Sequence, residues 1–207
     1  MISAILLGAG ESKRMGMNKL SLLWKKKTIF EHCLKTLLGS NVDEVIVVLN
    51  KKIQSPIHLF EDRKVKVVIN PHFHRGMSTS ICKGVQALDP KSKGILIALG
   101  DQPFLKTRTI DALVRAFQEG KGAIIVPSFR GKRGHPVIFH RKYEEELSRL
   151  KGDVGGRSIL EKHTQELKIL PVQSKGVVKD IDTWQDYRRG SRKKKGGLKE
   201  NRTPKGI

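Results

Sequence analysis

Residues 2–19, ISAILLGAGESKRMGMNK, decide how the chain folds, because an apolar run leads directly into a glycine-rich loop. The run Ile2–Leu7 is nearly continuous, which is typical of a buried strand in a parallel sheet. Residues 8–10 (GAG) follow at once, and Arg14 and Lys19 lie further along the loop. Glycines let backbone N–H groups approach an anion closely, and guanidinium and ammonium groups bind phosphates. The stretch therefore predicts a phosphate site at the carboxyl end of a buried strand.

Two common phosphate-binding loops do not match this stretch. A dinucleotide fingerprint that begins at Gly8 needs glycine at position 13, where Lys13 stands. A P-loop needs Gly-Lys-Ser/Thr, whereas Gly16 is followed by Met17. Both classes are excluded.

Outward from this loop, apolar runs alternate with helical periods. Further strands are expected at residues 44–49, 65–69, 94–99, 123–126, 136–139 and 167–172, with a last short strand before Asp180. Helices are expected at residues 28–38, 78–88, 107–118, 142–150 and 156–163, the first with a capping box of Thr28 and Glu31. This alternation predicts a layered α/β fold with a mostly parallel mixed sheet, whose ligands bind beyond the carboxyl ends of the strands.

The chain is strongly basic. It has 41 Lys and Arg against 20 Asp and Glu, a net charge of +21, which favours polyanionic partners such as nucleic acid, anionic lipid or phosphorylated small molecules. Residues 188–207 hold nine of these basic residues and one acid, and they lack apolar periodicity. We expect a domain over residues 1–187 and a disordered basic tail after it.

Membrane insertion and secretion are disfavoured. No stretch of about eighteen apolar residues is present. The apolar N-terminus has no basic lead-in and no small-residue cleavage site. Two cysteines, Cys33 and Cys82, form no disulfide framework, and they are expected to be buried core thiols. These features indicate a cytoplasmic, reducing compartment.

The loop resembles the L-x-A-G-x-S-x-R-M-G-x-x-K signature of the nucleotidyltransferases that build molybdenum cofactor dinucleotides, a subgroup of the glycosyltransferase-A-like fold. The matching residues are Leu7, Ala9, Gly10, Ser12, Arg14, Met15, Gly16 and Lys19, and Gly8 stands where the family has Ala or Gly. Later segments are similar in the same order, at residues 70–71 (NP), 76–80 (GMSTS), 100–103 (GDQP), 134–136 (GHP) and 180–183 (DIDT). The GDQP, GHP and DIDT forms point to the cytidylyltransferase branch. Residues 152–157 (GDVGGR) also resemble an element of relatives that serve molybdenum hydroxylases.

The resemblance implies a three-layer, Rossmann-like nucleotidyltransferase fold. The implied activity transfers CMP from CTP to a molybdopterin-type cofactor and releases pyrophosphate. The implied catalytic residues are Arg14, Lys19 and Asp101. The implied nucleotide-binding residues are Leu7, Gly8, Ala9, Gly10, Ser12, Arg14, Lys19, Gly76, Ser78, Ser80 and Asp101. Asp101 and Asp182 are implied ligands of Mg²⁺, which prefers carboxylate, water and phosphate oxygens. Gly134, His135 and Pro136 are the implied substrate loop.

Three alternatives stay open at this point. In the first, the nucleotide is GTP instead of CTP. In the second, the acceptor is another phosphorylated small molecule instead of a molybdopterin-type cofactor. A nucleic-acid binder would explain the basic tail, but not Asp101 or Asp182, and aromatic residues for base stacking make up only 5% of the chain. A basic run at residues 192–195 is a candidate contact for an acidic partner, such as the molybdoenzyme that receives the cofactor. On its own, Asp101 is more typical of a turn-capping aspartate than of a metal ligand.

Overall fold

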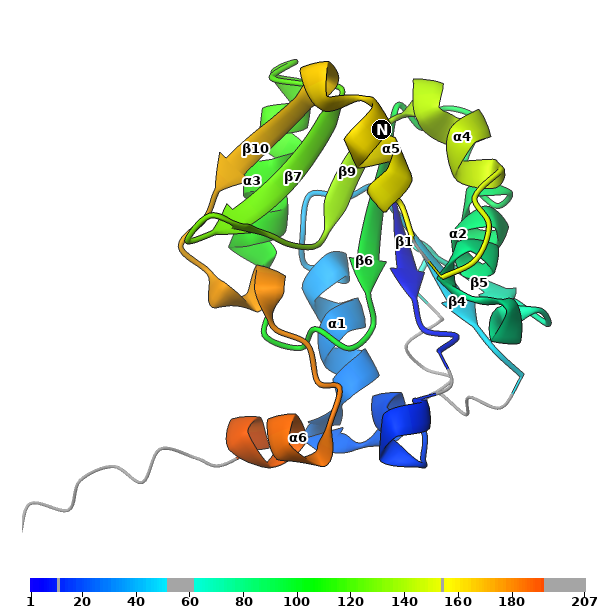
Figure 1. Cartoon of the computed structure of the whole chain (residues 1–207), viewed down its shortest axis with the longest axis vertical. Coiled ribbons are helices and arrows are strands. Elements are labelled where there is room, and N and C mark those ends of the chain that lie inside the picture. Colours follow the sequence, from blue (N-terminus) through cyan, green and yellow to red (C-terminus); the bar gives the residue numbers. More distant parts are fainter. Residues whose placement is uncertain (11, 52–61, 154, 192–207) are drawn as a thin grey trace, which may run out of the picture.

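A twisted sheet of eight strands organises the computed structural model, which describes residues 1–10, 12–51, 62–153 and 155–191 (Figure 1). The strand order is β10-β7-β9-β6-β1-β4-β5, and β8 pairs with β7. The strands are β1 (Ile2–Leu7), β4 (Glu44–Leu49), β5 (Val65–Ile69), β6 (Gly94–Leu99), β7 (Ile124–Phe129), β8 (Lys132–Arg133), β9 (Val137–His140) and β10 (Leu167–Pro171). Only β8 and β9 run antiparallel to their neighbours, so the sheet is mixed and mostly parallel, as predicted.

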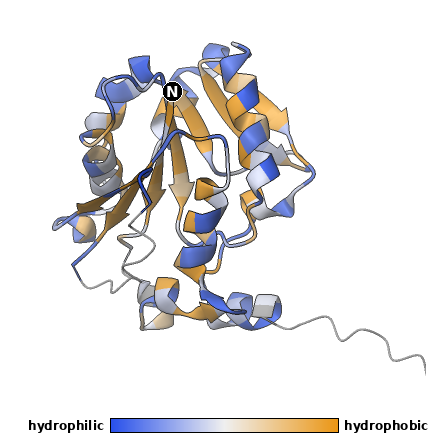
Figure 2. Ribbon diagram, turned by 180° about the vertical axis from the view of Figure 1, so that it is seen from behind, coloured by the Kyte–Doolittle hydropathy of each residue, from blue (hydrophilic) through white to orange (hydrophobic). Residues whose placement is uncertain are grey.

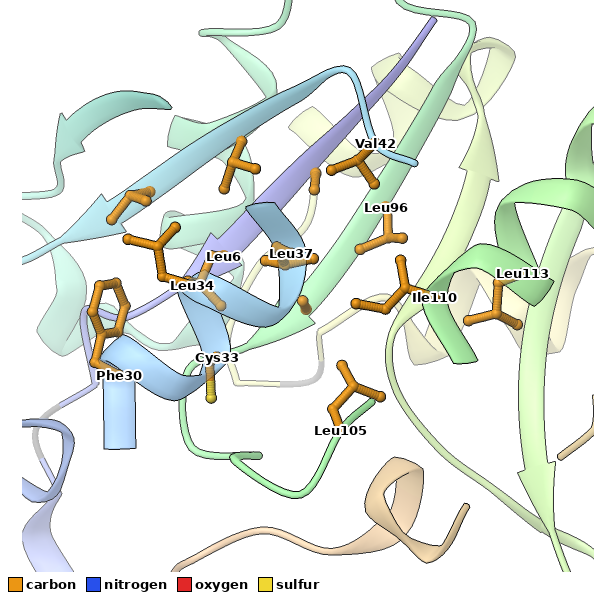
Figure 3. Packing of buried hydrophobic residues seen from close by; sticks show 14 of the residues in the cluster. Leu6, Phe30, Cys33, Leu34, Leu37, Val42, Leu96, Leu105, Ile110 and Leu113 are labelled. Carbon is orange, nitrogen blue, oxygen red and sulfur yellow. The ribbon is translucent and has the colours of Figure 1, made fainter. Parts of the chain in front are cut away.

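Helices cover both faces of the sheet and complete the three layers. They are α1 (Ile29–Leu38), α2 (Met77–Val85), α3 (Thr107–Gln118), α4 (Glu144–Ser148) and α5 (Arg157–Lys162). Helix α6 (Trp184–Ser191) lies beyond the carboxyl ends of β1 and β6 (Figure 1). One core lies between the sheet and helices α1 and α3, where Leu34, Leu37 and Ile110 pack on Leu6 and Leu96 (Figure 3). A second core on the other face joins the sheet to α2, α4 and α5. Accordingly, the strands are coloured as hydrophobic in Figure 2, whereas the helices have both hydrophobic and hydrophilic residues.

The central strands explain why the sequence signal is strong. Along β1, Ala4 and Leu6 point into the core with α1 and α3, whereas Ile5 points into the core with α2. All three side chains are fully buried. A strand that is covered on both faces needs apolar residues at every position, which produces the continuous run in the sequence.

Helix α1 begins with the predicted capping box. The Thr28 hydroxyl accepts from the Glu31 backbone N–H at 3.1 Å, and the Glu31 carboxylate accepts from the Thr28 N–H at 2.6 Å. These bonds satisfy backbone donors that have no partner inside the helix.

Several expected boundaries are wrong. No strand lies between β10 and Asp180 in the described residues, because Lys175–Val178 form a 3₁₀ turn. Helix α2 ends at Val85 rather than at residue 88, and the helix expected at 142–150 is a 3₁₀ turn, Arg141–Tyr143, followed by the short α4. Strand β7 extends to Phe129 instead of stopping at residue 126. A small antiparallel pair, β2 (Leu23–Trp24) with β3 (Lys27–Thr28), had no counterpart in the sequence prediction.

Two further expectations need correction. Cys33 is buried, but Cys82 is only half-buried. The boundary placed after residue 187 falls inside α6, which continues to Ser191, so disorder from Arg188 does not hold for residues 188–191. The rest of the expected tail, including the basic run at 192–195, lies outside the described residues. Within the described ranges, none of the helices has the length and apolar character needed to cross a membrane.

Candidate nucleotide-binding and catalytic site

The site forms where β1 and β6 end side by side (Figure 1). These parallel neighbours pair Leu7 with Leu99, so the loop after β1 adjoins the turn after β6. The Gly100 N–H donates to the Leu7 carbonyl at 2.9 Å, and a Cβ on Gly100 would lie 2.8 Å from that oxygen. Only glycine allows the two segments to come this close, which brings Asp101 to the edge of the loop.

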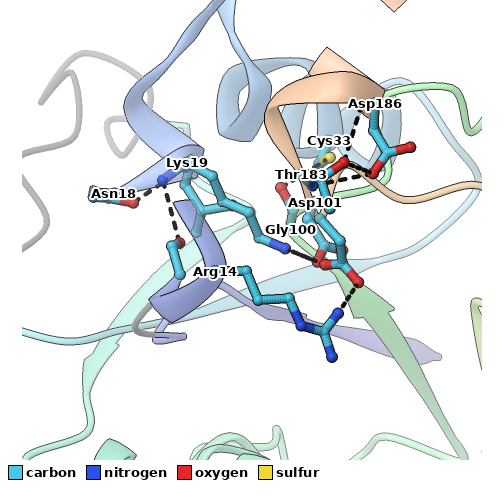
Figure 4. A network of polar contacts seen from close by, with 11 residues as sticks. Arg14, Asn18, Lys19, Cys33, Gly100, Asp101, Thr183 and Asp186 are labelled. Atoms are coloured by element: carbon cyan, nitrogen blue, oxygen red, sulfur yellow. Dashed lines mark hydrogen bonds and ion pairs between the residues drawn. The ribbon is translucent and has the colours of Figure 1, made fainter. Parts of the chain in front are cut away.

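A cluster of opposite charges lies at this junction (Figure 4). Lys19 Nζ donates to Asp101 Oδ2 and to Asp182 Oδ1, each at 2.7 Å. Arg14 Nη1 donates to Asp182 Oδ2 at 2.9 Å. The Lys19 side chain is 13% exposed, whereas the Arg14 side chain is 75% exposed. The predicted catalytic residues and the two predicted metal ligands therefore meet at one place.

The electrostatics keep Lys19 charged. Burial works to lower the pKa of Lys19, but the Asp101 and Asp182 carboxylates outweigh it, and the pKa is raised above its usual range. The pKa of Asp180 is also raised, first by partial burial and then by the Asp182 carboxylate beside it. Three carboxylates thus share this region with one buried ammonium.

The segment that carries Asp182 is fixed by backbone and capping bonds. The Ile181 N–H donates to the Asp101 carbonyl at 3.0 Å. At the start of α6, Thr183 Oγ1 donates to Asp186 Oδ2 at 2.6 Å, and the Asp186 N–H donates to Thr183 Oγ1 at 3.2 Å. These bonds on either side hold Asp182 next to Asp101.

The two carboxylates suit a hard cation. Asp101 Oδ1 is buried and has no hydrogen-bond partner among the described residues, while Asp182 is partly exposed. No group of three or more His, Cys, Asp or Glu side chains is arranged to hold a metal in the part of the chain that the structure describes. Mg²⁺ is commonly held by one or two carboxylates, with waters and substrate phosphates as its other ligands. Asp101 and Asp182 fit that pattern.

A cavity of about 330 Å³ opens next to the charged cluster. Eight of the predicted nucleotide-binding residues line it: Leu7, Ala9, Gly10, Ser12, Lys19, Gly76, Ser80 and Asp101. Six lining residues were not predicted: Leu20, Phe73, His74, Met77, Leu99 and Asp153. Met77 and Asp153 lie inside motifs that the sequence shows, but nothing in a linear motif says which of its side chains faces a cavity.

Gly8 and Ser78 support the cavity walls rather than lining them. The Gly8 N–H donates to the Val48 carbonyl at 2.8 Å, and a Cβ on Gly8 would lie 2.7 Å from the Phe30 ring. Ser78 is fully buried, and its hydroxyl donates to the Gly152 carbonyl at 2.6 Å. Both residues hold neighbouring backbone in place and are absent from the cavity lining, so their direct contact with a nucleotide stays a prediction.

The predicted substrate loop lies outside the cavity lining. Gly134 and Pro136 are buried, and the His135 N–H donates to the Val177 carbonyl at 2.8 Å. A Cβ on Gly134 would lie only 2.0 Å from that carbonyl oxygen, so glycine is required there. Burial lowers the pKa of His135, and the Asp101 carboxylate opposes this in part, which places the imidazole within electrostatic reach of Asp101.

Comparisons with known proteins show which family the chain belongs to. Residues 4–167 match the family model of the MobA-like NTP transferase domain. The purine catabolism protein PucB of Bacillus subtilis is 33% identical over 193 residues, which cover 88% of this chain and 92% of that protein. The nicotine blue oxidoreductase of Paenarthrobacter nicotinovorans is 27% identical over 189 residues, which likewise cover 88% of this chain and 92% of that protein. The molybdenum cofactor cytidylyltransferase of Escherichia coli is 26% identical over 137 residues, 66% of this chain and 69% of that protein.

The solved structures agree as well. The crystal structure of Rv0371c from Mycobacterium tuberculosis has a TM-score of 0.79 at 26% identity and covers 91% of this chain and 96% of that one. The manganese complex of Rv0371c has a TM-score of 0.74. The family match spans most of the described residues and includes the β1 loop and Asp101. The chain is a nucleotidyltransferase that belongs to the MobA-like NTP transferase family.

Proposed function

We propose that the chain transfers the CMP group of CTP to the terminal phosphate of a molybdopterin-type cofactor and releases pyrophosphate. The observation that carries the proposal is the meeting of Lys19, Arg14, Asp101 and Asp182 beside a cavity lined by the β1 loop. The GDQP, GHP and DIDT forms favour CTP, and the E. coli cytidylyltransferase is among the relatives.

The chemistry needs no protein nucleophile. An oxygen of the pterin phosphate attacks the α-phosphorus of CTP, a new P–O bond forms, and the bond to the β-phosphate oxygen breaks. Pyrophosphate leaves with the electron pair of that bond. Such transfer depends on positioning and on neutralising charge, and we assign these roles to Lys19, Arg14 and the backbone N–H groups of the β1 loop.

Mg²⁺ is the metal that we propose for this site. Asp101 and Asp182 would hold it, and Asp101 Oδ1, buried without a partner in the described part of the chain, is the oxygen with most to gain from a cation. When bound, Mg²⁺ would neutralise charge on the phosphates as they exchange partners. The manganese complex of Rv0371c supports a divalent cation of this type.

The remaining predicted residues are proposed to contact the nucleotide or to shape the acceptor side of the site. Gly76 and Ser80 line the cavity at the start of α2 and within it, and they are proposed to contact the nucleotide there. Gly134, His135 and Pro136 are proposed to shape the acceptor side, because their loop packs on the segment that leads to Asp182. A neutral His135 suits contact with an anionic pterin only as a hydrogen-bond partner, not as a counter-ion.

The decisive experiment incubates the purified chain with molybdopterin, Mg²⁺ and an equimolar mixture of CTP, GTP and ATP. Mass spectrometry of the pterin product should show the cytosine dinucleotide, with equal release of pyrophosphate. The Asp101→Ala variant should form no product, and Glu119→Ala, which removes an exposed carboxylate paired with Lys121, should behave like the wild type. A guanine dinucleotide would shift the assignment to GTP, and turnover only with other phosphorylated acceptors would refute the pterin.

A further inference from the structure

Asp153 gives the cavity a second carboxylate, far along the chain from Asp101. It follows α4 and lines the cavity together with Gly76 and Met77, whose N–H it contacts. The residue is exposed, and none of the described residues forms an ion pair with it. The charged cluster around Lys19 does not use it.

The Gly152–Asp153 backbone is fixed against the first turn of α2. Ser78 donates to the Gly152 carbonyl through both its hydroxyl, at 2.6 Å, and its N–H, at 3.3 Å. Gly76 adopts a φ of +106°, and a Cβ there would lie 2.6 Å from the Gly152 oxygen. The positive φ and the close approach both demand glycine at position 76.

The Asp153 side chain caps this helix. Its Oδ1 accepts from the Met77 N–H at 2.9 Å, a backbone donor at the start of α2, and Gly76 has no side chain to do so. The bond orients the carboxylate, and the negative charge compensates the positive end of the helix dipole. The N-terminus of a helix otherwise favours phosphate binding, but the Asp153 carboxylate makes the N-terminus of α2 unfavourable to a phosphate.

The two walls of the cavity therefore differ in charge. Lys19 with the glycine-rich loop attracts phosphates, whereas Asp153 repels them and can only accept hydrogen bonds. An ionised carboxylate has about four acceptor positions, and the Met77 N–H takes one. The neutral donors of CTP are its ribose hydroxyls and the amino group of its base. Of these, the ribose hydroxyls are common to all ribonucleotides, and carboxylates bind them in other nucleotide sites.

We infer that Asp153 binds the ribose hydroxyls of the nucleotide and makes the enzyme prefer ribonucleotides over deoxyribonucleotides. The inference rests on the proposed function only in that a nucleoside triphosphate occupies this cavity, and it does not depend on which base is bound. Loss of a hydrogen bond to a charged group should weaken binding by about tenfold or more.

The test measures equilibrium binding of CTP and of 2′-deoxy- and 3′-deoxy-CTP to the full chain, by calorimetry. The wild type should bind CTP about tenfold more tightly than the weaker of the two deoxy analogues. Asp153→Ala should bind CTP only as tightly as the wild type binds the weaker deoxy analogue. The affinity for that deoxy analogue should be nearly the same in Asp153→Ala and in the wild type. Asp153→Asn keeps an acceptor for the Met77 N–H and should give an intermediate ratio, which covers the case in which the alanine variant does not fold.

The ratio separates recognition from support of the fold. A residue that only capped α2 would weaken CTP and deoxy-CTP equally, so an unchanged ratio in Asp153→Ala and Asp153→Asn overturns the inference. Glu145→Gln is the matched control, because Glu145 is an exposed carboxylate on α4 that pairs with Arg149, away from the cavity lining. If GTP or ATP binds instead of CTP, the same ratio is measured with that pair, and only the choice of CTP fails. Binding of no ribonucleotide to the wild type would overturn both proposals.

Discussion

Lys19 determines how the charges of the site are arranged at the scale of single residues. Asp101 and Asp182 would repel each other without a cation nearby, and the Lys19 ammonium donates to both. It is largely buried and held by two carboxylates, whereas Arg14 is mostly exposed and holds only Asp182 in the described part of the chain. Lys19 therefore has a fixed position next to the cavity, and Arg14 has the freedom to follow a phosphate.

Lys19→Ala should reduce transfer strongly. Its charge acts on the bound triphosphate and on the charge that develops as pyrophosphate leaves, so kcat should fall and the KM for CTP should rise, with kcat/KM lower by about 100-fold or more. Steady-state kinetics with CTP tests this. Lys142→Ala is the control, because it removes an exposed lysine that pairs with Glu166 and does not line the cavity. Unchanged kcat and KM would show that Lys19 has only a structural role.

His135 should make stability depend on pH in a defined direction. Burial lowers its pKa in the folded chain, more than Asp101 raises it, so the unfolded chain takes up a proton on this residue at higher pH. Stability should then fall as the pH drops below about 6.5, the usual pKa of histidine. The melting temperature of His135→Asn should fall less steeply between about pH 7 and 5 than that of the wild type. His72→Asn, at an exposed position, is the control, and equal slopes for His135→Asn and the wild type would contradict the assignment.

At the scale of elements, short capped segments position the side chains that the long elements do not carry. Asp182 owes its place to the bond between Ile181 and Asp101 and to the Thr183–Asp186 cap of α6. The strand expected before it is absent because Ser174 caps a 3₁₀ turn, in which a Cβ on Gly176 would lie 2.2 Å from the Phe104 carbonyl oxygen. Two consecutive valines resembled a strand in the sequence, but the turn buries Val177 and half-buries Val178 without one.

The start of the β1 loop gives an element-scale prediction. Gly8 is packed so closely that a Cβ would lie 2.7 Å from Phe30 and 2.8 Å from Leu49, whereas a Cβ on Gly10 would meet nothing within 4 Å. Gly8→Ala should therefore lower the free energy of unfolding by about 1–3 kcal/mol through overpacking. Gly10→Ala should leave stability nearly unchanged and weaken CTP binding, because Gly10 lines the cavity. Urea unfolding and calorimetric titration measure the two effects, and equal stability losses would contradict the packing argument.

Across the whole molecule, the sequence predicted the buried strands and the site residues that lie in motifs. It missed the short strands that form only by pairing with a neighbour. The central strands were found because both of their faces are covered, which requires unbroken apolar runs. β3 and β8 were missed because Lys27-Thr28 and Lys132-Arg133 are too short and polar to show an apolar pattern. They are strands only because they pair with β2 and β7, respectively. Likewise Asp101 and Lys19 stand in recognisable motifs, whereas Phe73 and Leu99 line the cavity through adjacency that only the fold creates.

The net charge of +21 should make salt act in opposite directions on stability and on binding. Like charges on the folded chain repel one another, so raising NaCl from about 50 to 500 mM should raise the melting temperature. The same screening weakens attraction of CTP to Lys19 and Arg14, so the dissociation constant for CTP should increase over that range. Compared with the wild type, Lys19→Ala should show a weaker salt dependence of CTP binding, because it removes a principal charge of the site. The salt dependence of its melting temperature should be unchanged, because the variant loses only one of 41 basic residues. A melting temperature that falls together with affinity would show that local ion pairs, rather than overall repulsion, dominate the stability of the chain.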